Sequence, residues 1–548
     1  MKLHTIPVML AVFVAPYAVG SGSMTLHPES PGIEVGTTWY EAQHNGTLSR
    51  MISQKPDGNV FFVWTNALDE SWLERHVFFN STSLFPDSVG TRLNPLSSLR
   101  AGYVTCDATS DNRMVAAYHI VAPMRTAIYV ESVVDTFRSE PYIWPHIAVD
   151  NVDNVHIVST AIPAHADSPA AVYYCRTVDA GSTFSAWQTV DTIFHVECEV
   201  QASRHSGKVV IAYNHPVSWM RGPSLSDILY VESTDNGDTW DWSAKVNVTG
   251  AQPIDTLVPY RDVSAVYDEL DSLHLVYTAR HMEDTTNLHL SSAIIHWSAT
   301  VGFTVVYRDT MQGWPCDRNQ GQRRLTADTP SLGVDPSTGY LYCVFTASTA
   351  GDTSASGWPN NDLWMSYSTD NGLTWSSIVN LTNSSTPGAN PDSCDDDEWP
   401  SLAEIVNDTV HILYINDKDA GIASAFPSEG ARTLNPVLYM KIPVDSVVGI
   451  DDVGQEQPVK PLSFGLHSPV PNPCRNSFMV TYEIAKEEMV NLSLYDLAGR
   501  LVTTFLSKRQ SAGIGTTIYR NSTLPSGIYY CVLEAGAISR TRKVVWLR

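Results

Sequence analysis

A run of carboxylates near position 395 is the most concentrated charge in this chain. Asp395, Asp397 and Glu398 stand immediately before Trp399. Oxygen ligands at this density could coordinate Ca²⁺, which would then be the protein's cofactor, or two of them could flank a glycosidic bond as an acid–base pair. The spacing does not match an EF-hand, and a solvated acidic turn is the alternative interpretation.

Tryptophans in predicted loops are a second candidate feature. Most of the 15 Trp and 24 Tyr residues fall in apolar, strand-like runs, where packing against neighbours explains them. Trp314 and Trp399 fall between such runs, where an aromatic ring could instead stack on a sugar. We therefore treat both as candidate ligand-binding residues.

The composition excludes several classes of function. A formal net charge of −24 over 548 residues argues against nucleic-acid binding, which needs a basic surface, and against adhesion to anionic membranes. The sequence contains no glycine-rich phosphate loop, no nucleophile elbow and no HExxH motif. With 43% hydrophobic and 17% charged residues, the chain is globular.

Three near-identical turns indicate how the chain positions its side chains. Each follows a strand-like run and reads Ser/Thr-x-Asp-x-Gly-x-Thr-aromatic. The Asp can accept hydrogen bonds from backbone N–H groups, and the Gly supplies a positive φ. The copies span residues 177–184, 233–240 and 368–375. A motif that recurs in this way indicates a repeat protein.

Seven strand–turn–strand units can be read along the chain, and each is followed by a third strand. Four short strands per unit predict an all-β protein whose main part is a β-propeller of seven blades. Six blades is the alternative if the first or last unit is only part of a blade. The units span residues 49–66, 101–119, 145–160, 197–214, 261–278, 330–346 and 400–416.

The chain divides into four predicted segments. Residues 1–20 have the features of a signal peptide, because Lys2 precedes an apolar run that ends in small residues. Residues 36–444 would form the propeller, and residues 445–462 are a polar linker with Gly and Pro. Residues 463–548 return to alternating strands, which predict a small Ig-like β-sandwich.

The repeated turn resembles the Asp-box, or BNR repeat, of sialidase-like propellers. The resemblance implies a structural role at the outer turn of a blade, away from any central site. The residues that it assigns to this role are Asp179, Gly181, Phe184, Asp235, Gly237, Trp240, Asp370, Gly372 and Trp375.

A sialidase-type site would clamp a carboxylate with three arginines and would use an Asp as acid/base. The resemblance points to Arg50, Arg261 and Asp262 as catalytic candidates and to Arg280 as a ligand-binding candidate. The aromatic and proline residues that accompany the first arginine in that family are missing around Arg50. A complete clamp does not assemble, and the alternative is that these arginines form surface or inter-strand ion pairs.

The last 86 residues, 463–548, resemble the type IX (Por) secretion C-terminal sorting domain. The resemblance implies passage through the periplasm, recognition by the type IX secretion machinery, and a protein that is secreted or held on the outer cell surface. The motifs that carry it are Pro471-Asn472-Pro473, Tyr495-Asp496-Leu497-Ala498-Gly499-Arg500, Leu524-Pro525-Ser526-Gly527-Ile528-Tyr529 and Lys543-Val544-Val545.

Export would permit disulfides among the eight cysteines. Cys316 and Cys394 occupy matching connections before the sixth and seventh units, so neighbouring blades would bring them together. A bridge between Cys474 and Cys531 is the second candidate, within the segment that resembles the sorting domain.

Two functions follow from these observations. We expect a monomer that binds a glycan or a surface protein on the loop-bearing face of the propeller, because the arginine clamp is incomplete. The alternative is an exo-acting glycoside hydrolase of the sialidase type.

Overall fold

We describe a computed structural model of the chain. It places residues 30–547, and the following positions within that range lie outside the description: 85–88, 94–97, 132–135, 162–169, 194–196, 217–225, 251–256, 283–287, 310–324, 426–427, 449–464, 467–468, 470–471, 476, 485, 487, 511–512, 522 and 537. The predicted signal peptide, Trp314 and Cys316 therefore also lie outside the described residues.

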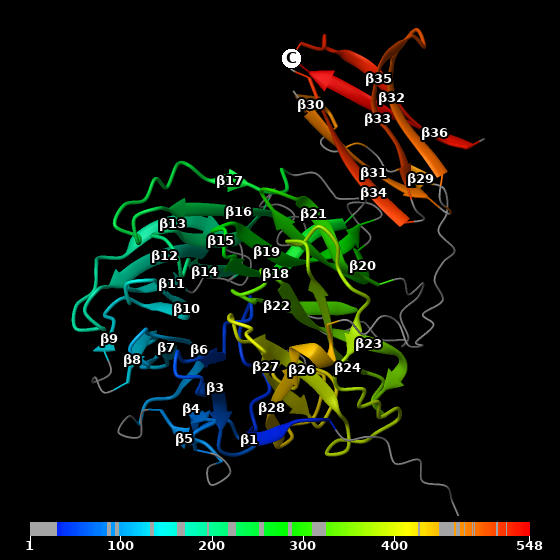
Figure 1. Cartoon of the computed structure of the whole chain (residues 1–548). Helices are drawn as coiled ribbons and strands as arrows, with labels where there is room; N and C mark the ends of the chain where they lie inside the picture. Colours follow the sequence, from blue (N-terminus) through cyan, green and yellow to red (C-terminus); the bar gives the residue numbers. More distant parts are fainter. Residues whose placement is uncertain are drawn as a thin grey trace, which may run out of the picture.

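Seven four-stranded antiparallel sheets follow one another around a ring, from blue through cyan and green to yellow in Figure 1, which confirms the predicted seven-bladed propeller. In each blade the first strand of the meander is the innermost. Blades 1 to 3 consist of β2 (Ile52–Gln54), β3 (Val60–Ala67), β4 (Arg75–Ser81) and β5 (Thr91–Arg92); β6 (Ala101–Ala108), β7 (Met114–Ile120), β8 (Arg125–Val130) and β9 (Thr136–Phe137); and β10 (Tyr142–Val149), β11 (Val155–Ala161), β12 (Ala170–Thr177) and β13 (Gln188–Ile193).

The remaining blades repeat this order, and the last is followed by the 3-10 helix η2 (Val444–Ser446). Blades 4 to 6 consist of β14 (Cys198–Ala202), β15 (Val209–Pro216), β16 (Ser226–Ser233) and β17 (Val246–Asn247); β18 (Leu257–Tyr267), β19 (Leu273–Met282), β20 (Leu288–Ser298) and β21 (Gly302–Arg308); and β22 (Ala327–Val334), β23 (Leu341–Thr353), β24 (Pro359–Ser368) and β25 (Val379–Asn380). Blade 7 contains β26 (Asp396–Leu402), β27 (Thr409–Asp417) and β28 (Asn435–Pro443).

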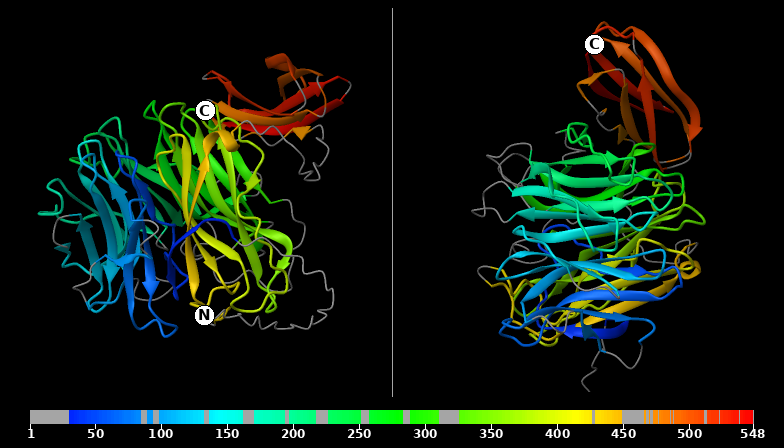
Figure 2. Two further views of the ribbon diagram at one scale, coloured as in Figure 1. Left: turned by 60° about the horizontal axis from the view of Figure 1, so that its bottom comes forward. Right: turned by 90° about the vertical axis from the view of Figure 1, so that its left-hand side faces the viewer.

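The N-terminal strand closes the ring. β1 (Ile33–Thr38) is the outermost strand of blade 7 and pairs antiparallel with β28, with Ile33 opposite Tyr439 and Thr38 opposite Asn435. Figures 1 and 2 show the blue strand beside the yellow blade. Two ends of the propeller sequence therefore meet in one sheet.

Apolar contacts between neighbouring blades hold the ring together. Val115 and Ile128 of blade 2 share one buried cluster with Ile147, Val149 and Ile157 of blade 3. The alternation of side chains along each strand gives every blade two apolar faces, and each face is buried against the next sheet.

The repeated turns connect the third and fourth strands of blades 3, 4 and 6, and all three make the same hydrogen bonds. In the copy at 368–375, Asp370 Oδ1 accepts the Thr374 backbone N–H at 2.8 Å, and Ser368 Oγ accepts the N–H of Gly372 at 2.8 Å. Asp179 and Asp235 accept equivalent bonds from Thr183 and Thr239. The predicted turn chemistry is confirmed, with φ values of +85°, +68° and +80° at the three glycines.

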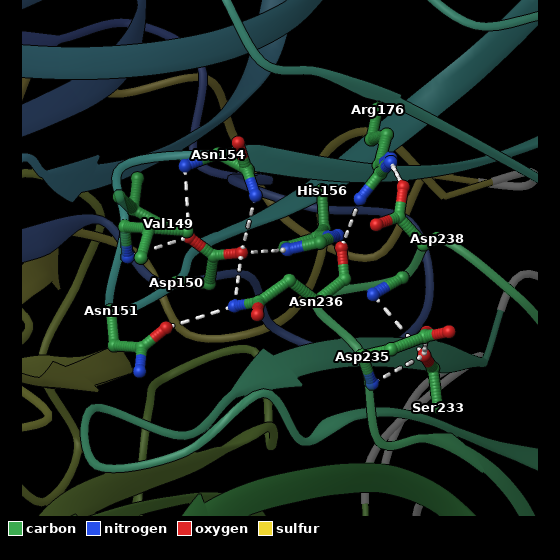
Figure 3. A network of polar contacts seen from close by, with 12 residues as sticks. Val149, Asp150, Asn151, Asn154, His156, Arg176, Ser233, Asp235, Asn236 and Asp238 are labelled. Atoms are coloured by element: carbon green, nitrogen blue, oxygen red, sulfur yellow. Dashed lines mark hydrogen bonds and ion pairs between the residues drawn. The ribbon is translucent and has the colours of Figure 1, made fainter.

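Two of these turns also bind the preceding blade, as Figure 3 shows for the turn of blade 4. Asn236 donates to Asp150 of blade 3 at 2.8 Å, and the same carboxylate meets His156 Nε2 at 3.1 Å. The other nitrogen of His156 lies 2.9 Å from the hydroxyl of Tyr174, against which Gly237 packs. Because a Cβ on Gly237 would lie 2.2 Å from that hydroxyl, only glycine fits this contact.

The C-terminal module is a sandwich of two sheets. Phe478, Tyr482 and Trp546 are among the buried residues of its core. The three-stranded sheet contains β29 (Gly465–Leu466), β31 (Ser477–Ile484) and β34 (Gly513–Arg520), and the five-stranded sheet contains β30 (Cys474–Arg475), β36 (Ile538–Leu547), β35 (Gly527–Ala535), β32 (Glu488–Asp496) and β33 (Leu501–Gln510).

The predicted bridge between Cys474 and Cys531 is wrong, because both are free, buried thiols. Cys474 pairs with Trp546 of β36, whereas Cys531 lies opposite Arg542 of that strand, so the register separates the two sulfurs. Cys394 is also a free thiol, and its Sγ lies 3.6 Å from the carbonyl oxygen of Ala389.

Candidate functional site

Five of the seven innermost strands carry the same irregularity near their first residues. In each, a non-glycine residue adopts a left-handed φ of 50° to 57° where the ladder register shifts. This conformation costs L-residues roughly 1–2 kcal/mol each, and such strain gathers at functional sites. The five residues are Tyr103, Trp144, Asp262, Thr329 and Trp399.

We call the end of the propeller where the innermost strands begin the upper face. The three repeated turns lie at the opposite end, because strands of a meander alternate in direction and these turns follow the third strand. The same left-handed bulge therefore recurs in five blades at the upper face. Three of them place an aromatic ring there, in blades 2, 3 and 7, and two place a polar group, in blades 5 and 6.

The segment that joins β1 to β2, residues 39–51, crosses the upper face and then enters the ring of innermost strands; we call it the strap. Thr47 Oγ1 donates to Glu197 of blade 4 at 3.1 Å and accepts the N–H of Val263 of blade 5 at 3.3 Å. Ser49 Oγ lies 3.3 Å from His146 Nδ1 of blade 3. The strap therefore links blades that lie far from its own.

Aromatic rings cluster where the strap leaves blade 7. The buried residues Tyr40, Ala42 and Ala67 form a small cluster. Four half-buried aromatic residues pack against it: Trp39, Trp72, Tyr103 and Trp399. The rings of Tyr40 and Trp72 meet edge to face with centres 5.1 Å apart, and Trp72 also has a left-handed φ of 59°. Half-buried rings held at this angle offer apolar faces to a ligand.

Two indole N–H groups at the upper face have no acceptor among the described residues. The Nε1 atoms of Trp144 and Trp399 are buried and make no hydrogen bond to any described residue. The Nδ1 of His119 and the hydroxyl of Thr160 are likewise unsatisfied in the described part of the chain. Because buried polar groups in proteins are normally bonded, this set points to a polar ligand or bound water at the upper face.

The protonation states in this cluster favour hydrogen-bond donors. Burial raises the pKa of Tyr40 far above its usual value, and the neighbouring Tyr103 raises it further, so Tyr40 keeps its proton. Burial, with Arg75 and Arg100 nearby, lowers the pKa of His119 to about 3, so this imidazole is neutral. A protonated tyrosine can donate a hydrogen bond, and a neutral imidazole can donate from one ring nitrogen and accept at the other.

The polar part of the upper face contains Arg261 and Asp262, two of the residues predicted to be catalytic. Arg261 Nε lies 3.3 Å from Asp262, and its Nη2 lies 2.6 Å from Asp328. The backbone N–H of Asp262 donates to Glu197 at 3.1 Å. Burial raises the pKa of Asp262 to about 8 despite the attraction of Arg261.

Arg50, the third residue predicted to be catalytic, takes part in a different set of ion pairs. Its Nη1 lies 3.3 Å from Glu404 and 3.7 Å from Asp107, and Arg204 binds both carboxylates, at 2.6 and 2.7 Å. Gln201 accepts from Arg50 at 2.8 Å and donates to Glu404 at 2.7 Å. This cross-linked cluster fits the inter-strand ion-pair interpretation of Arg50.

Arg204 was not singled out from the sequence, because no motif marks it. Arg280, predicted to bind a ligand, stacks its guanidinium 4.0 Å from the centre of the Tyr260 ring. Trp399, also predicted to bind a ligand, lies on the upper face.

Asp397 and Glu398 lie in strand β26 and Asp395 directly precedes it, and because all three are buried the solvated-turn interpretation of the sequence is wrong. Asp395 and Asp397 have different partners. Asp395 pairs with Lys418 at 2.6 Å, whereas Asp397 accepts from Ser384 and Asn416 at 2.7 and 2.8 Å. No group of three or more metal-ligating side chains occurs among the described residues, so the predicted Ca²⁺ site is not formed there.

The comparisons with known proteins support export. Residues 470–546 match the family described as the secretion system C-terminal sorting domain. The protein is thus exported by type IX secretion to the cell surface or the extracellular space and interacts with that machinery. No helix in the described part of the chain is long and apolar enough to cross a membrane.

Solved structures that resemble the chain do so distantly. The polysaccharide lyase Uly1 is 9% identical with a TM-score of 0.40, covering 77% of this chain and 94% of its own. An α-L-arabinanase from Penicillium chrysogenum is 11% identical with a TM-score of 0.39, covering 75% and 98%. A protein of unknown function from Dyadobacter fermentans is 10% identical with a TM-score of 0.37, covering 75% and 99%. A search of curated proteins found no significant match.

Proposed function

We propose that this exported propeller binds a glycan on its upper face. The observation that carries the proposal is the set of left-handed aromatic residues, Trp72, Tyr103, Trp144 and Trp399. A chain that only needed to pack would avoid this conformation at bulky residues. Rings fixed in this way supply stacking surfaces for sugars, and the unsatisfied indole and imidazole nitrogens supply hydrogen-bonding groups for hydroxyls.

Binding is favoured over the alternative, a sialidase-type glycoside hydrolase, by the state of the candidate clamp. Arg50 is held by Asp107 and Glu404, and Arg261 is held by Asp262 and Asp328. Recruiting Arg261 for a substrate carboxylate would leave the buried Asp328 without its counter-ion, which costs several kcal/mol. Recruiting Arg50 would remove one of the two guanidinium groups that neutralise Asp107 and Glu404. The repeated turns resemble the Asp-box, which supports a sialidase-like propeller. Two of them bind the preceding blade, at the end of the propeller opposite the upper face.

The test is affinity electrophoresis and calorimetry of the full secreted chain against a panel of soluble polysaccharides. Trp399→Gly and Trp144→Gly remove a ring while keeping the left-handed backbone acceptable, so we expect at least about a tenfold loss of affinity for the bound polysaccharide. Trp242→Ala is the matched control, because Trp242 stacks on Trp240 beside the turn of blade 4, at the other end.

The outcomes separate the two functions. Retained affinity in both glycine variants, with folding verified by circular dichroism, would refute binding at the upper face. Steady release of reducing ends from any polysaccharide by the wild type, lost in Arg261→Gln or Asp262→Asn, would establish the hydrolase instead.

A further inference from the structure

Two arginines at the upper face have no acidic partner among the described residues, although the whole chain carries 58 acidic and only 34 basic residues. Arg75 is 4% exposed and Arg100 is half-buried, and neither forms an ion pair with any described residue. Seven of the other described arginines form ion pairs with carboxylates. Those with a carboxylate within ion-pair distance are Arg50, Arg113, Arg138, Arg176, Arg204, Arg261 and Arg500.

Arg75 is fixed in place by neutral groups. Its guanidinium carbon lies 4.4 Å from the centre of the Tyr40 ring and 5.1 Å from that of Tyr103, and its Nε donates to the carbonyl of Ala101 at 3.2 Å. These contacts occupy the planar face and the Nε–H of the Arg75 guanidinium group. Its remaining N–H groups can therefore donate to another acceptor.

Arg100 adds a second positive charge to the same place. Burial and the proximity of Arg75 lower the pKa of Arg100, and its Nε is buried with no acceptor in the described structure. Besides burial, the positive charges of Arg75 and Arg100 lower the pKa of His119. In the strap, Glu41 Oε1 accepts the N–H of Ser424 in blade 7 at 2.8 Å.

We propose that Arg75 and Arg100, together with the hydroxyl of Tyr103, bind an anionic group of the glycan, either a carboxylate or a sulfate ester. This inference rests on the proposed glycan binding and names the chemical class of its ligand. Buried charges in proteins are normally paired, and a planar guanidinium matches the geometry of an oxyanion. The anionic group of the glycan would be the counter-ion of the two arginines.

The overall charge of the protein makes this site selective. At −24 the chain repels polyanions on average, so an acidic glycan gains affinity only where the local charge is positive. We expect binding to the anion to weaken with salt, as it does for any contact between charged groups that stays partly exposed.

The test compares polygalacturonate with the same polymer after reduction of its carboxyl groups, and with a sulfated galactan, at equal ionic strength. We expect the full chain to bind one of the acidic polymers about tenfold tighter or more than the reduced polymer. Arg100→Gln should abolish that preference, so that the acidic and the reduced polymer bind with similar affinity. Arg113→Gln is the control, because Arg113 pairs with Asp111 at the exposed turn after β6.

The outcomes distinguish this inference from glycan binding itself. Equal affinity for acidic and reduced polymers, or a preference that survives Arg100→Gln and Arg75→Gln, overturns the anion site and leaves the glycan site standing. If no polymer binds but galacturonate or sulfate raises the melting temperature in an Arg100-dependent way, the anion site stands and glycan binding fails. The carboxylate and sulfate arms identify the group, and circular dichroism confirms that each variant is folded.

Discussion

The hydroxyl oxygens of Tyr40 and Tyr103 lie 2.6 Å apart, which joins the strap to the innermost strand of blade 2. Tyr40→Phe removes one partner and leaves the other without its bond. We expect the free energy of unfolding to fall by about 0.5–1.5 kcal/mol in urea denaturation. Tyr340→Phe, whose hydroxyl has no described hydrogen bond, should change it little, and an equal loss in both variants would contradict a specific contact.

The left-handed bulges should favour glycine once the aromatic ring is gone. Trp399→Ala and Trp399→Gly both lose the packing of the ring, but only alanine retains a Cβ at φ 57°. We therefore expect the glycine variant to be more stable by about 1 kcal/mol, the reverse of the usual order in strands. Thermal unfolding of the two variants side by side measures the difference, and an alanine variant of equal or higher stability would show that the backbone relaxes.

Gly237 of the repeated turn in blade 4 should tolerate substitution less well than Gly388, which lies outside the repeated turns. In Gly237→Ala the new methyl meets the Tyr174 hydroxyl at 2.2 Å, so strain and overpacking together should cost about 2–4 kcal/mol. Gly388 has a similar φ of 74° with no atom within 4 Å of the added Cβ. Gly388→Ala therefore isolates the backbone term of about 1 kcal/mol. Similar losses at both sites would mean that the inter-blade contact is loose.

Removing one acid from the ion cluster around Arg204 should be costly. Asp107 accepts from Arg204 and lies near Arg50, and its side chain is 1% exposed. We expect Asp107→Asn to lower the free energy of unfolding by about 3–5 kcal/mol, because two guanidinium groups lose a buried counter-ion. Asp111→Asn at an exposed pair should cost less than about 1 kcal/mol. Chemical denaturation compares the two, and a small effect at Asp107 would mean that water compensates there.

Asp397 should make stability depend on pH. Burial raises its pKa to about 7, whereas an unfolded Asp releases its proton near pH 4. The folded state therefore holds a proton that the unfolded state loses, so this contribution is complete below about pH 4 and declines as pH rises to 7. Asp397→Asn should remove a slope of up to about 1.4 kcal/mol per pH unit between pH 5 and 7. Parallel profiles for wild type and variant would show that Asp397 does not bind this proton.

Local patterns predicted the architecture well. Strand alternation and the Asp–Gly turns are properties of neighbouring residues, so the seven inner hairpins and the turn hydrogen bonds of Asp179, Asp235 and Asp370 followed from the sequence. That β1 completes blade 7 did not follow, because Thr38 and Asn435 are paired only through closure of the whole ring.

The candidate site was predicted less well for the same physical reason. Arg261 and Asp262 were singled out as adjacent residues, and they do touch. The partners of Arg50 come from blades 2 and 7, and the absence of an acid beside Arg75 can be seen only once the neighbours are known. The sequence did contain a signal for three of the bulges: Trp144, Thr329 and Trp399 are each followed by proline. Within sheets, proline is found mainly at bulges, at strand starts and on edge strands.

The pairing of β1 with β28 also determines how the propeller responds to proteolysis. Because both ends of the propeller sequence lie in one sheet, cutting a single surface turn opens the chain but frees no blade from its two neighbours. A nicked molecule would stay assembled as a non-covalent ring, and a second cut would be needed before any fragment could leave. For an exported protein, the N-terminal strand thus keeps a nicked propeller assembled as well as completing blade 7.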